Sequence, residues 1–202
     1  MHTTVAVPQK PHAGEHQRTA LAVLMVALVA LLLGWALKTS VESRSSQFTA
    51  LGGALSLRYP AAWVVSKGDE DTLLVVSDPH AHSSFDPTLI VHVRTLPEGQ
   101  RLIDVATSWA LGRARVLREF HDLGSEETTL GGKPAVRLNS AQVADPPRGV
   151  GMAALPIVVR GADTIVIQGN QYLVFSAASE AVAGELDPRF AAILSSVKLT
   201  GK

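Results

Sequence analysis

The chain of 202 residues contains no cysteine and no excess of charge of either sign. Without cysteine it cannot form disulfides, use thiolate chemistry or bind zinc or iron–sulfur clusters through sulfur. Lys and Arg total 18, and Asp and Glu also total 18. Residues 45–202 are slightly acidic, with 14 basic and 16 acidic side chains. This balance lacks the strongly basic surface by which proteins bind nucleic acid, so we predict no nucleic-acid partner.

Motifs of catalysis are also missing. There is no G-x-S-x-G sequence and no phosphate-binding loop. Ser140, Ser176 and the scattered histidines show no arrangement typical of a catalytic triad. Residues 149–154, GVGMAA, match a loose dinucleotide-binding pattern, but they stand between a proline-rich loop and a predicted strand, whereas that motif needs a strand followed by a helix. We therefore predict that the protein is not an enzyme and has no catalytic residues.

A long uncharged run lies near the N-terminus. Residues 19–37, TALAVLMVALVALLLGWAL, are bracketed by Arg18 and Lys38. As a helix rising about 1.5 Å per residue, such a run just spans a hydrocarbon core of about 30 Å. It is longer than the apolar region of a signal peptide and has no convincing cleavage site, so we predict an uncleaved transmembrane signal anchor at 19–38. A cleaved signal peptide and a buried core helix are the alternatives.

The rest of the chain divides around this segment. Residues 1–18 hold prolines, a glycine and three histidines but few apolar side chains, which predicts a disordered tail. Residues 39–47 are polar and predict a short linker. The folded domain is expected at 48–200. The short tail and the large C-terminal domain favour a single-pass protein of the cell membrane, with the N-terminus cytoplasmic and the domain extracytoplasmic.

The domain opens with a strand. Between 54 and 59, apolar side chains alternate with polar ones, which is the period of a half-buried strand. Pro60 ends this strand, and a second begins at Trp63, so 54–65 predicts the first hairpin of a sheet. Further strands are predicted at 72–78, 88–96, twice within 122–143, at 153–161, and twice within 163–177, where Gly169 and Asn170 form the turn.

Two stretches change from strand to helix period. Residues 101–120 place apolar side chains three and four positions apart, which predicts an amphipathic helix. Asp187 and Pro188 open a short C-terminal helix with one apolar face. Consecutive strands connect by tight turns, which favours antiparallel pairing. The sequence therefore predicts an α+β fold, an antiparallel β-sheet with helices packed on it.

Four segments resemble the PsbP-like family. They are GGALSLRYPAAWVV at 52–65, TTLGGKPAVRLNSAQV at 128–143, GNQYLVFSAAS at 169–179 and FAAILSSVKL at 190–199. In this order they span nearly all of 48–199. The resemblance implies the α/β/α sandwich shared by PsbP and the Ran-binding Mog proteins, here in a membrane-anchored bacterial member. It also implies a role in binding rather than catalysis.

One loop has the composition of a metal site. It carries Asp78, His80, His82 and Asp86 within SDPHAHSSFDP. A His-x-His pair in extended chain points both rings to one side, and the two carboxylates complete a set of ligands suited to zinc or manganese. His92 on the next predicted strand is a further candidate. The alternative is a solvated polar loop, and no cofactor other than such a divalent metal is predicted.

These observations predict a non-enzymatic, membrane-anchored accessory protein. Its domain is expected to bind, assemble or stabilise a larger membrane protein complex, of a photosynthetic or respiratory kind. Residues 19–37 are expected to contact the lipid bilayer. The alternatives are a binding module for a small ligand, a lipid or a divalent metal at the membrane surface, and an enzyme such as a hydrolase.

Overall fold

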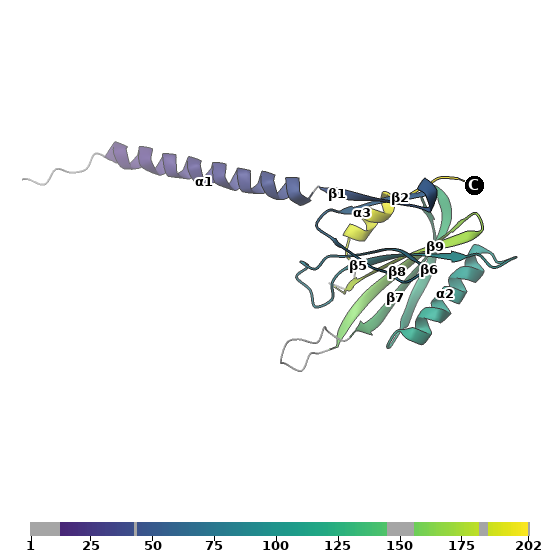
Figure 1. Cartoon of the computed structure of the whole chain (residues 1–202). Helices are drawn as coiled ribbons and strands as arrows, with labels where there is room; N and C mark the ends of the chain where they lie inside the picture. The colour runs from purple at the N-terminus through teal and green to yellow at the C-terminus, as the bar shows by residue number, and fades with distance from the viewer. Residues whose placement is uncertain (1–12, 43, 145–155, 182–185, 202) are drawn as a thin grey trace, which may run out of the picture. The chain divides into compact units, whose positions relative to one another are not determined.

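Figure 1 shows the computed structural model of the chain, which forms two compact units, Met1–Arg44 and Ser45–Lys202. The structure describes four stretches, which are 13–42, 44–144, 156–181 and 186–201. Two features considered in the sequence lie outside them. These are the first part of the predicted tail, residues 1–12, and the dinucleotide-like match at 149–154.

The N-terminal unit contains helix α1 (Ala13–Glu42, 30 residues). The helix begins inside the segment that we predicted to be disordered, because Ala, Glu and Gln near its start are good helix formers. Where the structure describes side chains, no helix combines the length and the apolar character needed to span a bilayer. The membrane anchor remains a prediction from the sequence.

The C-terminal unit is built from two antiparallel sheets and helices. The described strands are β1 (Ser45–Ala50), β2 (Leu55–Pro60), β3 (Val64–Ser66), β4 (Thr72–Ser77), β5 (Thr88–Thr95), β6 (His121–Leu130), β7 (Lys133–Ala144), β8 (Ile157–Gln168), β9 (Gln171–Glu180) and β10 (Lys198–Leu199). The helices are η1 (Leu51–Gly53), α2 (Leu102–Val116) and α3 (Arg189–Ser195). One sheet has the order β1-β2-β10 and the other β3-β4-β5-β9-β8-β7-β6. The predicted α+β class is confirmed.

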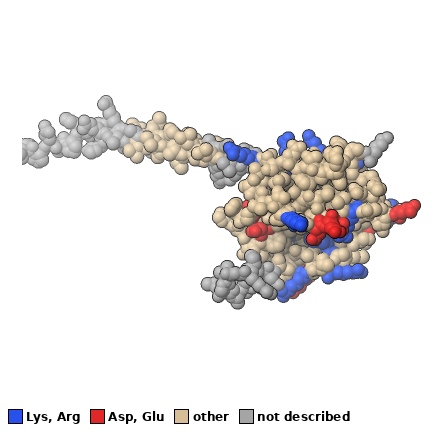
Figure 2. Space-filling view, in the orientation of Figure 1, with Lys and Arg blue, Asp and Glu red and all other residues tan. Residues whose placement is uncertain are grey.

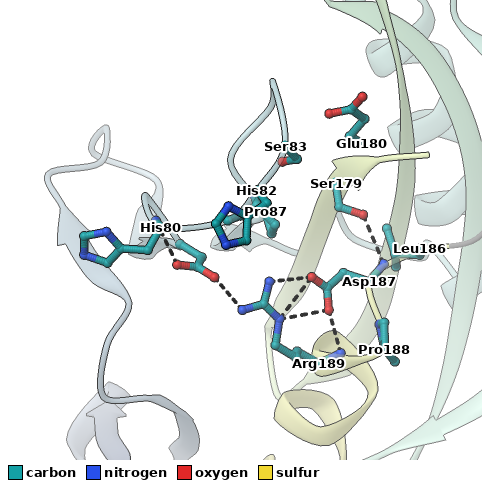
Figure 3. Close-up of a pocket in the computed structure, with 12 residues that line it drawn as sticks. His80, His82, Ser83, Pro87, Ser179, Glu180, Leu186, Asp187, Pro188 and Arg189 are labelled. Atoms are coloured by element: carbon teal, nitrogen blue, oxygen red, sulfur yellow. Dashed lines mark hydrogen bonds and ion pairs between the residues drawn. The ribbon is translucent and has the colours of Figure 1, made fainter. Parts of the chain in front are cut away.

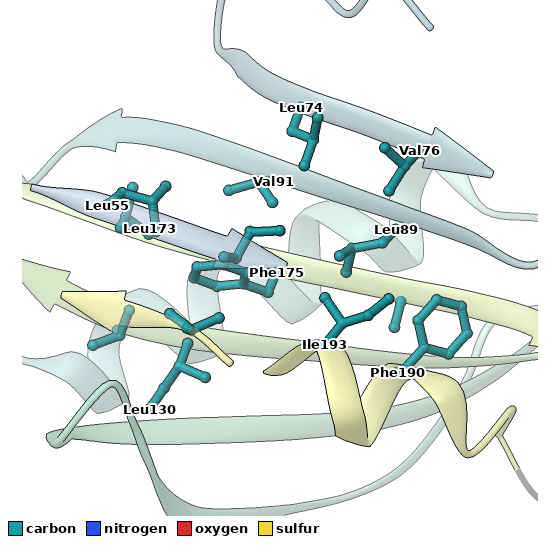
Figure 4. Packing of buried hydrophobic residues seen from close by; sticks show 14 of the residues in the cluster. Leu55, Leu74, Val76, Leu89, Val91, Leu130, Leu173, Phe175, Phe190 and Ile193 are labelled. Carbon is teal, nitrogen blue, oxygen red and sulfur yellow. The ribbon is translucent and has the colours of Figure 1, made fainter. Parts of the chain in front are cut away.

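The main core lies between the seven-stranded sheet and the layer formed by α3 with the small sheet (Figure 4). Leu55 and Leu57, two positions apart on β2, are both buried in it, as the alternation of a strand requires. Phe175 enters from β9, and Phe190 and Ile193 enter from α3. Burial of these side chains holds α3 against the sheet and therefore places the residues at the start of α3.

Helix α2 packs on the opposite face of the seven-stranded sheet, so the unit has three layers (Figure 1). Val105 and Ala106 of α2 are buried in a second cluster, whose strand members are Val136, Ile165 and Val174. The predicted helix was correct in kind but too long. It ends at Val116 because the next residue adopts an extended conformation, with φ of −93° and ψ of 136°.

The predicted hairpin at 54–65 is wrong. Strand β2 pairs with β1 and β10 in the small sheet, whereas β3 pairs with β4 in the large sheet. The amide of Trp63 donates to the carbonyl of Pro60 at 3.0 Å, and this turn carries the chain from one sheet to the other. Leu55 and Leu57 of β2 are buried in the core, whereas Val64 and Val65 of β3 are exposed, and the buried side chain of this segment is Trp63, which directly precedes β3.

Two further boundaries differ from the expectations. Strand β1 begins at Ser45, inside the predicted linker, because its amides and carbonyls pair with β2. Strand β8 is one continuous strand where we predicted two, and Gly161 lies within it because a Cβ there would stand 2.7 Å from the Ser140 Oγ. The predicted turn at Gly169 and Asn170 is confirmed, with a φ of 63° at the glycine.

Candidate functional site

A pocket of ≈ 630 Å³ opens between the loop that joins β4 to β5 and the start of α3 (Figure 3). The end of β9 forms its third side. Its lining residues are Asp78, His80, Ala81, His82, Ser83, Pro87, Ser179, Glu180, Leu186, Asp187, Pro188 and Arg189. The pocket therefore brings the β4–β5 loop together with two segments, 179–180 and 186–189, that are far from it in the sequence.

Arg189 joins two walls of this pocket. Its guanidinium donates hydrogen bonds to the carboxylate of Asp187, at 2.6 Å from Nη2 and 3.0 Å from Nε, and to the carboxylate of Asp78. It also lies over the ring of Trp63, 5.4 Å from the ring centre. Asp78 is buried, so this ion pair fixes the β4–β5 loop against the first residue of α3. We call Asp78, Asp187 and Arg189 the arginine clamp.

The arginine clamp shifts the pKa values of Asp187 and Arg189. Burial of the Asp187 carboxyl favours the neutral form, but hydrogen bonds from the side chain and backbone of Arg189 outweigh burial and hold the pKa of Asp187 below its ordinary value. The hydrogen bond to Asp187 is the largest cause of a raised pKa for Arg189, and burial opposes it. Asp187 and Arg189 therefore stay charged at neutral pH.

The pocket keeps an excess of negative charge. Its lining contains three carboxylates, those of Asp78, Glu180 and Asp187, and one guanidinium. Glu180 stands outside the arginine clamp, at the end of β9, and its Oε2 accepts the backbone N–H of Ser84 at 2.7 Å. With neutral histidines, the lining carries an excess of two negative charges. The site therefore favours a cationic ligand.

This charge is a local feature. In the view of Figure 2, acidic and basic side chains of the C-terminal unit are interspersed among uncharged ones, and no broad patch of one sign covers this face. The chain as a whole is neutral. Attraction of a cationic ligand would therefore come from the few groups at the pocket itself, which act over a short range at physiological salt.

The predicted metal ligands are partly brought together. Asp78, His80 and His82 line the pocket, and the amide of His80 donates to Asp78 Oδ1 at 3.1 Å. The ring of His80 is turned away from Arg189 (Figure 3). Asp86 is exposed and does not line the pocket. Within the described residues, no three His, Asp or Glu side chains are arranged to hold a metal ion, and the predicted metal site stays a prediction.

The clamp residue Arg189 was not identified from the sequence. Asp187 was noted only as the start of a helix, and Glu180 was not singled out. The sequence did contain a local signal for the contact between Asp187 and Arg189. Asp187 Oδ1 accepts the amide of Arg189 two residues later, as aspartates at the start of helices often do. The partner across the pocket, Asp78, is 111 positions away, and no local pattern could have shown that pairing.

Comparison with known proteins gives matches in structure only. No protein-family model matches the chain, and no curated protein matches it in sequence. The solution structure of cyanobacterial PsbP (CyanoP) from Synechocystis has a TM-score of 0.54 and 14% identity, over 77% of this chain and 92% of that one. The Ran-binding protein Mog1p of Saccharomyces cerevisiae has a TM-score of 0.52 and 12% identity, over 77% and 95%.

The fold is that of PsbP and Mog1p. LpqN of Mycobacterium tuberculosis, involved in cell envelope biogenesis, has the same fold, with a TM-score of 0.52 and 15% identity over 78% of this chain and 91% of that one. At these identities the likeness concerns the fold alone. It confirms the PsbP-like sandwich expected from the four sequence segments.

On its other face, the PsbP-like domain buries polar groups beneath α2. Asp163 on β8 pairs with Arg113 of α2, with 3.3 Å between Oδ2 and Nε, and the Asp163 side chain is 5% exposed. Ser176 lies directly opposite Asp163 on β9, and Ser140 is likewise buried on β7. None of these three lines the pocket, so the two serines are not placed as nucleophiles there.

His92 belongs to the same buried layer. The centre of its ring lies 5.4 Å from the centre of the Trp109 ring. The guanidinium of Arg94 lies over the same Trp109 ring, 5.5 Å from its centre. Burial is the main cause of a lowered pKa for His92. Nearby Arg94 and Arg113 lower this pKa further, while carboxylates on β8 and in the turn before β4 oppose the shift.

We expect His92 to make folding stability depend on pH below neutrality. Because the pKa of His92 in the folded state is lower than the unfolded value of 6.5, the unfolded chain binds the proton more readily. The stabilising contribution is complete above pH 6.5 and is lost as the pH falls from there towards the folded pKa. Urea unfolding of the full chain at a series of pH values measures this effect.

The control is His92→Phe, which keeps a ring against Trp109 but does not titrate. The difference in unfolding free energy between the wild type and this variant should rise with pH up to 6.5 and then stay constant. Exposed histidines such as His80 and His82 are the same in both proteins and cancel. A difference that does not change with pH would contradict the prediction.

Proposed function

We propose that the chain is a non-enzymatic accessory protein whose PsbP-like domain binds another protein at the pocket beside the arginine clamp. The observation that carries the proposal is the pocket itself, because Arg189 ties two segments together around an opening of ≈ 630 Å³. A site held in place before the ligand arrives loses little entropy on binding. Mog1p, which shares the fold, is a Ran-binding protein, and this supports a protein as the ligand.

We further propose that the domain works at a membrane surface. Residues 19–37 carry no charge and are bracketed by Arg18 and Lys38, as expected of a single-pass anchor. In this proposal the N-terminus is cytoplasmic and residues 45–202 are extracytoplasmic. The tether would keep the pocket close to membrane proteins, which raises the local concentration of such partners. The domain would then bind, assemble or stabilise a larger membrane complex.

Site-directed photo-crosslinking tests the proposal. A benzophenone amino acid replaces His82 at the pocket in one version of the full chain, and Glu127 on β6 in the control version. Both positions are exposed, but only His82 lines the pocket. After irradiation of intact cells, we expect one dominant adduct from position 82 and little from position 127, because the partner covers the pocket.

The same crosslinking experiment can contradict the proposal. Equal amounts of adduct from positions 82 and 127 would rule out a partner at the pocket. So would the absence of any adduct, if the protein also elutes alone from a size-exclusion column in mild detergent. Washing the membranes with alkaline carbonate tests the anchor separately. Release of the wild-type chain by this wash would contradict the anchor, whereas release only after deletion of 19–37 would support it.

A further inference from the structure

We infer that the pocket receives a basic side chain, arginine or lysine, from the partner protein. This inference rests on the proposed function and adds the chemistry by which the partner is recognised. It starts from the charge of the lining, in which three carboxylates face one guanidinium. A ligand with one positive charge reduces this imbalance, whereas a phosphate or a carboxylate would increase it.

Glu180 is the carboxylate best placed to meet this ligand. The carboxylates of Asp78 and Asp187 already accept hydrogen bonds from Arg189. Glu180 lies outside the arginine clamp, and one of its oxygens accepts the amide of Ser84. That bond fixes the position of the carboxylate on the pocket wall. A guanidinium or ammonium that reaches Glu180 would form a charge-assisted hydrogen bond of the strong kind.

The rest of the lining fits the stem of a basic side chain. Ala81, Pro87, Leu186 and Pro188 contribute apolar surface to the pocket. Arginine and lysine carry three or four methylene groups before the charge, and these pack on apolar surface while the charged end meets polar groups. A lining that combines apolar walls with one fixed carboxylate therefore suits such a side chain better than a small hydrated ion.

A divalent cation would have to compete with Arg189. Two of the three pocket carboxylates are already paired with its guanidinium, and Asp78 also accepts the amide of His80. To bind both carboxylates, a metal ion would break these bonds and place its charge next to the arginine. A basic side chain can use Glu180 and leave the arginine clamp intact.

NMR titration of the full chain in a mild detergent tests the inference. The probe is Nα-acetyl-arginine amide, and its control is the citrulline analogue, which has nearly the same shape but no charge. We expect the arginine probe to shift the amide signals of His82, Ser84 and Arg189 in a saturable way. The citrulline analogue should leave them unchanged, and added salt should weaken the arginine response.

Glu180→Gln provides the decisive variant. Glutamine keeps an oxygen that can accept the Ser84 amide but removes the charge. Affinity for the arginine probe should fall by roughly two- to fivefold, as for the loss of one partly exposed ion pair. Glu127→Gln on β6 is the matched control, because it removes the same charge at an exposed position that does not line the pocket. It should leave the affinity unchanged.

Three results would overturn the inference. One is equal binding of the arginine and citrulline probes, and another is unchanged affinity in Glu180→Gln. The third is displacement of the arginine probe by zinc chloride alone, with shifts centred on His80 and His82, which would assign the pocket to a metal. If the His82 crosslink persists in spite of any of these, a partner still covers the pocket, so the proposed function survives and only its chemistry fails.

Discussion

Replacing Arg189 by methionine is expected to destabilise the C-terminal unit by about 2–3 kcal/mol, because two carboxylates would lose their counter-charge. The side chains of Asp78 and Asp187 are only 10% and 14% exposed. Removing one partner of a fully buried ion pair costs about 3–5 kcal/mol, and we expect less here because the Arg189 side chain is 42% exposed to screening solvent. Urea unfolding at neutral pH measures the loss.

Acidification separates the charge effect from lost packing against Trp63. The lowered pKa of Asp187 contributes stability that is present above its ordinary value of 3.8 and is lost as the pH falls through the folded pKa. The variant lacks this contribution, so its deficit relative to the wild type should be largest at neutral pH and shrink below about pH 4. A deficit that is equal at all pH values would contradict the charge explanation.

Two further variants complete this test. Lys67→Met removes a cation from an exposed turn and should change stability by less than about 0.5 kcal/mol. Adding Asp78→Asn to Arg189→Met should recover part of the loss, because only one carboxylate then remains in the arginine clamp. If Lys67→Met costs as much as Arg189→Met, the loss reflects general surface charge and the clamp has no special role.

Phe190→Ala is expected to be the most damaging single substitution near the pocket, with a loss of about 3–5 kcal/mol. The Phe190 side chain is 1% exposed, and its ring meets the ring of Trp63 edge to face with 5.6 Å between centres. Alanine would leave a cavity between α3 and the sheet. Because Phe190 follows Arg189 directly, loosening this contact should also weaken binding of the arginine probe. Urea unfolding and the NMR titration measure the two effects.

A graded series controls this prediction. Phe190→Leu fills most of the space and should cost clearly less than Phe190→Ala. Leu111→Ala on α2 removes an apolar side chain that is 58% exposed, and it should have little effect. If Phe190→Ala destabilised the protein no more than Leu111→Ala, that result would contradict the burial of Phe190 between α3 and the sheet.

Much of the local structure could be predicted from the sequence, because it depends on neighbours along the chain. The helical spacing within Leu102–Val116 and the turn at Gly169 and Asn170 are such features. The apolar face of the last helix is another, and Phe190 and Ile193 are buried as that face requires. The same holds for the fold class, since four short segments in a fixed order sufficed to indicate the PsbP-like sandwich.

Strand partners could not be predicted in the same way. Alternation shows that Leu55 and Leu57 share a face, but it does not show which strand lies beside them. The hairpin expected at 54–65 failed for this reason, since β2 pairs with β1 and β10 in the small sheet whereas β3 pairs with β4 in the large sheet. Strand β1 was missed because only two of its residues, Phe48 and Ala50, are apolar, and such a short alternation is a weak signal without the pairing to β2.

By itself, the sequence determined the uncharged segment at 19–37, the absence of cysteine chemistry, most of the elements of the domain and its fold class. It also drew attention to the loop that carries Asp78, His80 and His82. Only the tertiary structure decided that this loop faces Glu180 and the start of α3, and that Arg189 holds its aspartate. The physical reason is distance along the chain: local periodicity determines helices and strands, whereas an ion pair between residues 111 positions apart forms only once the core has packed.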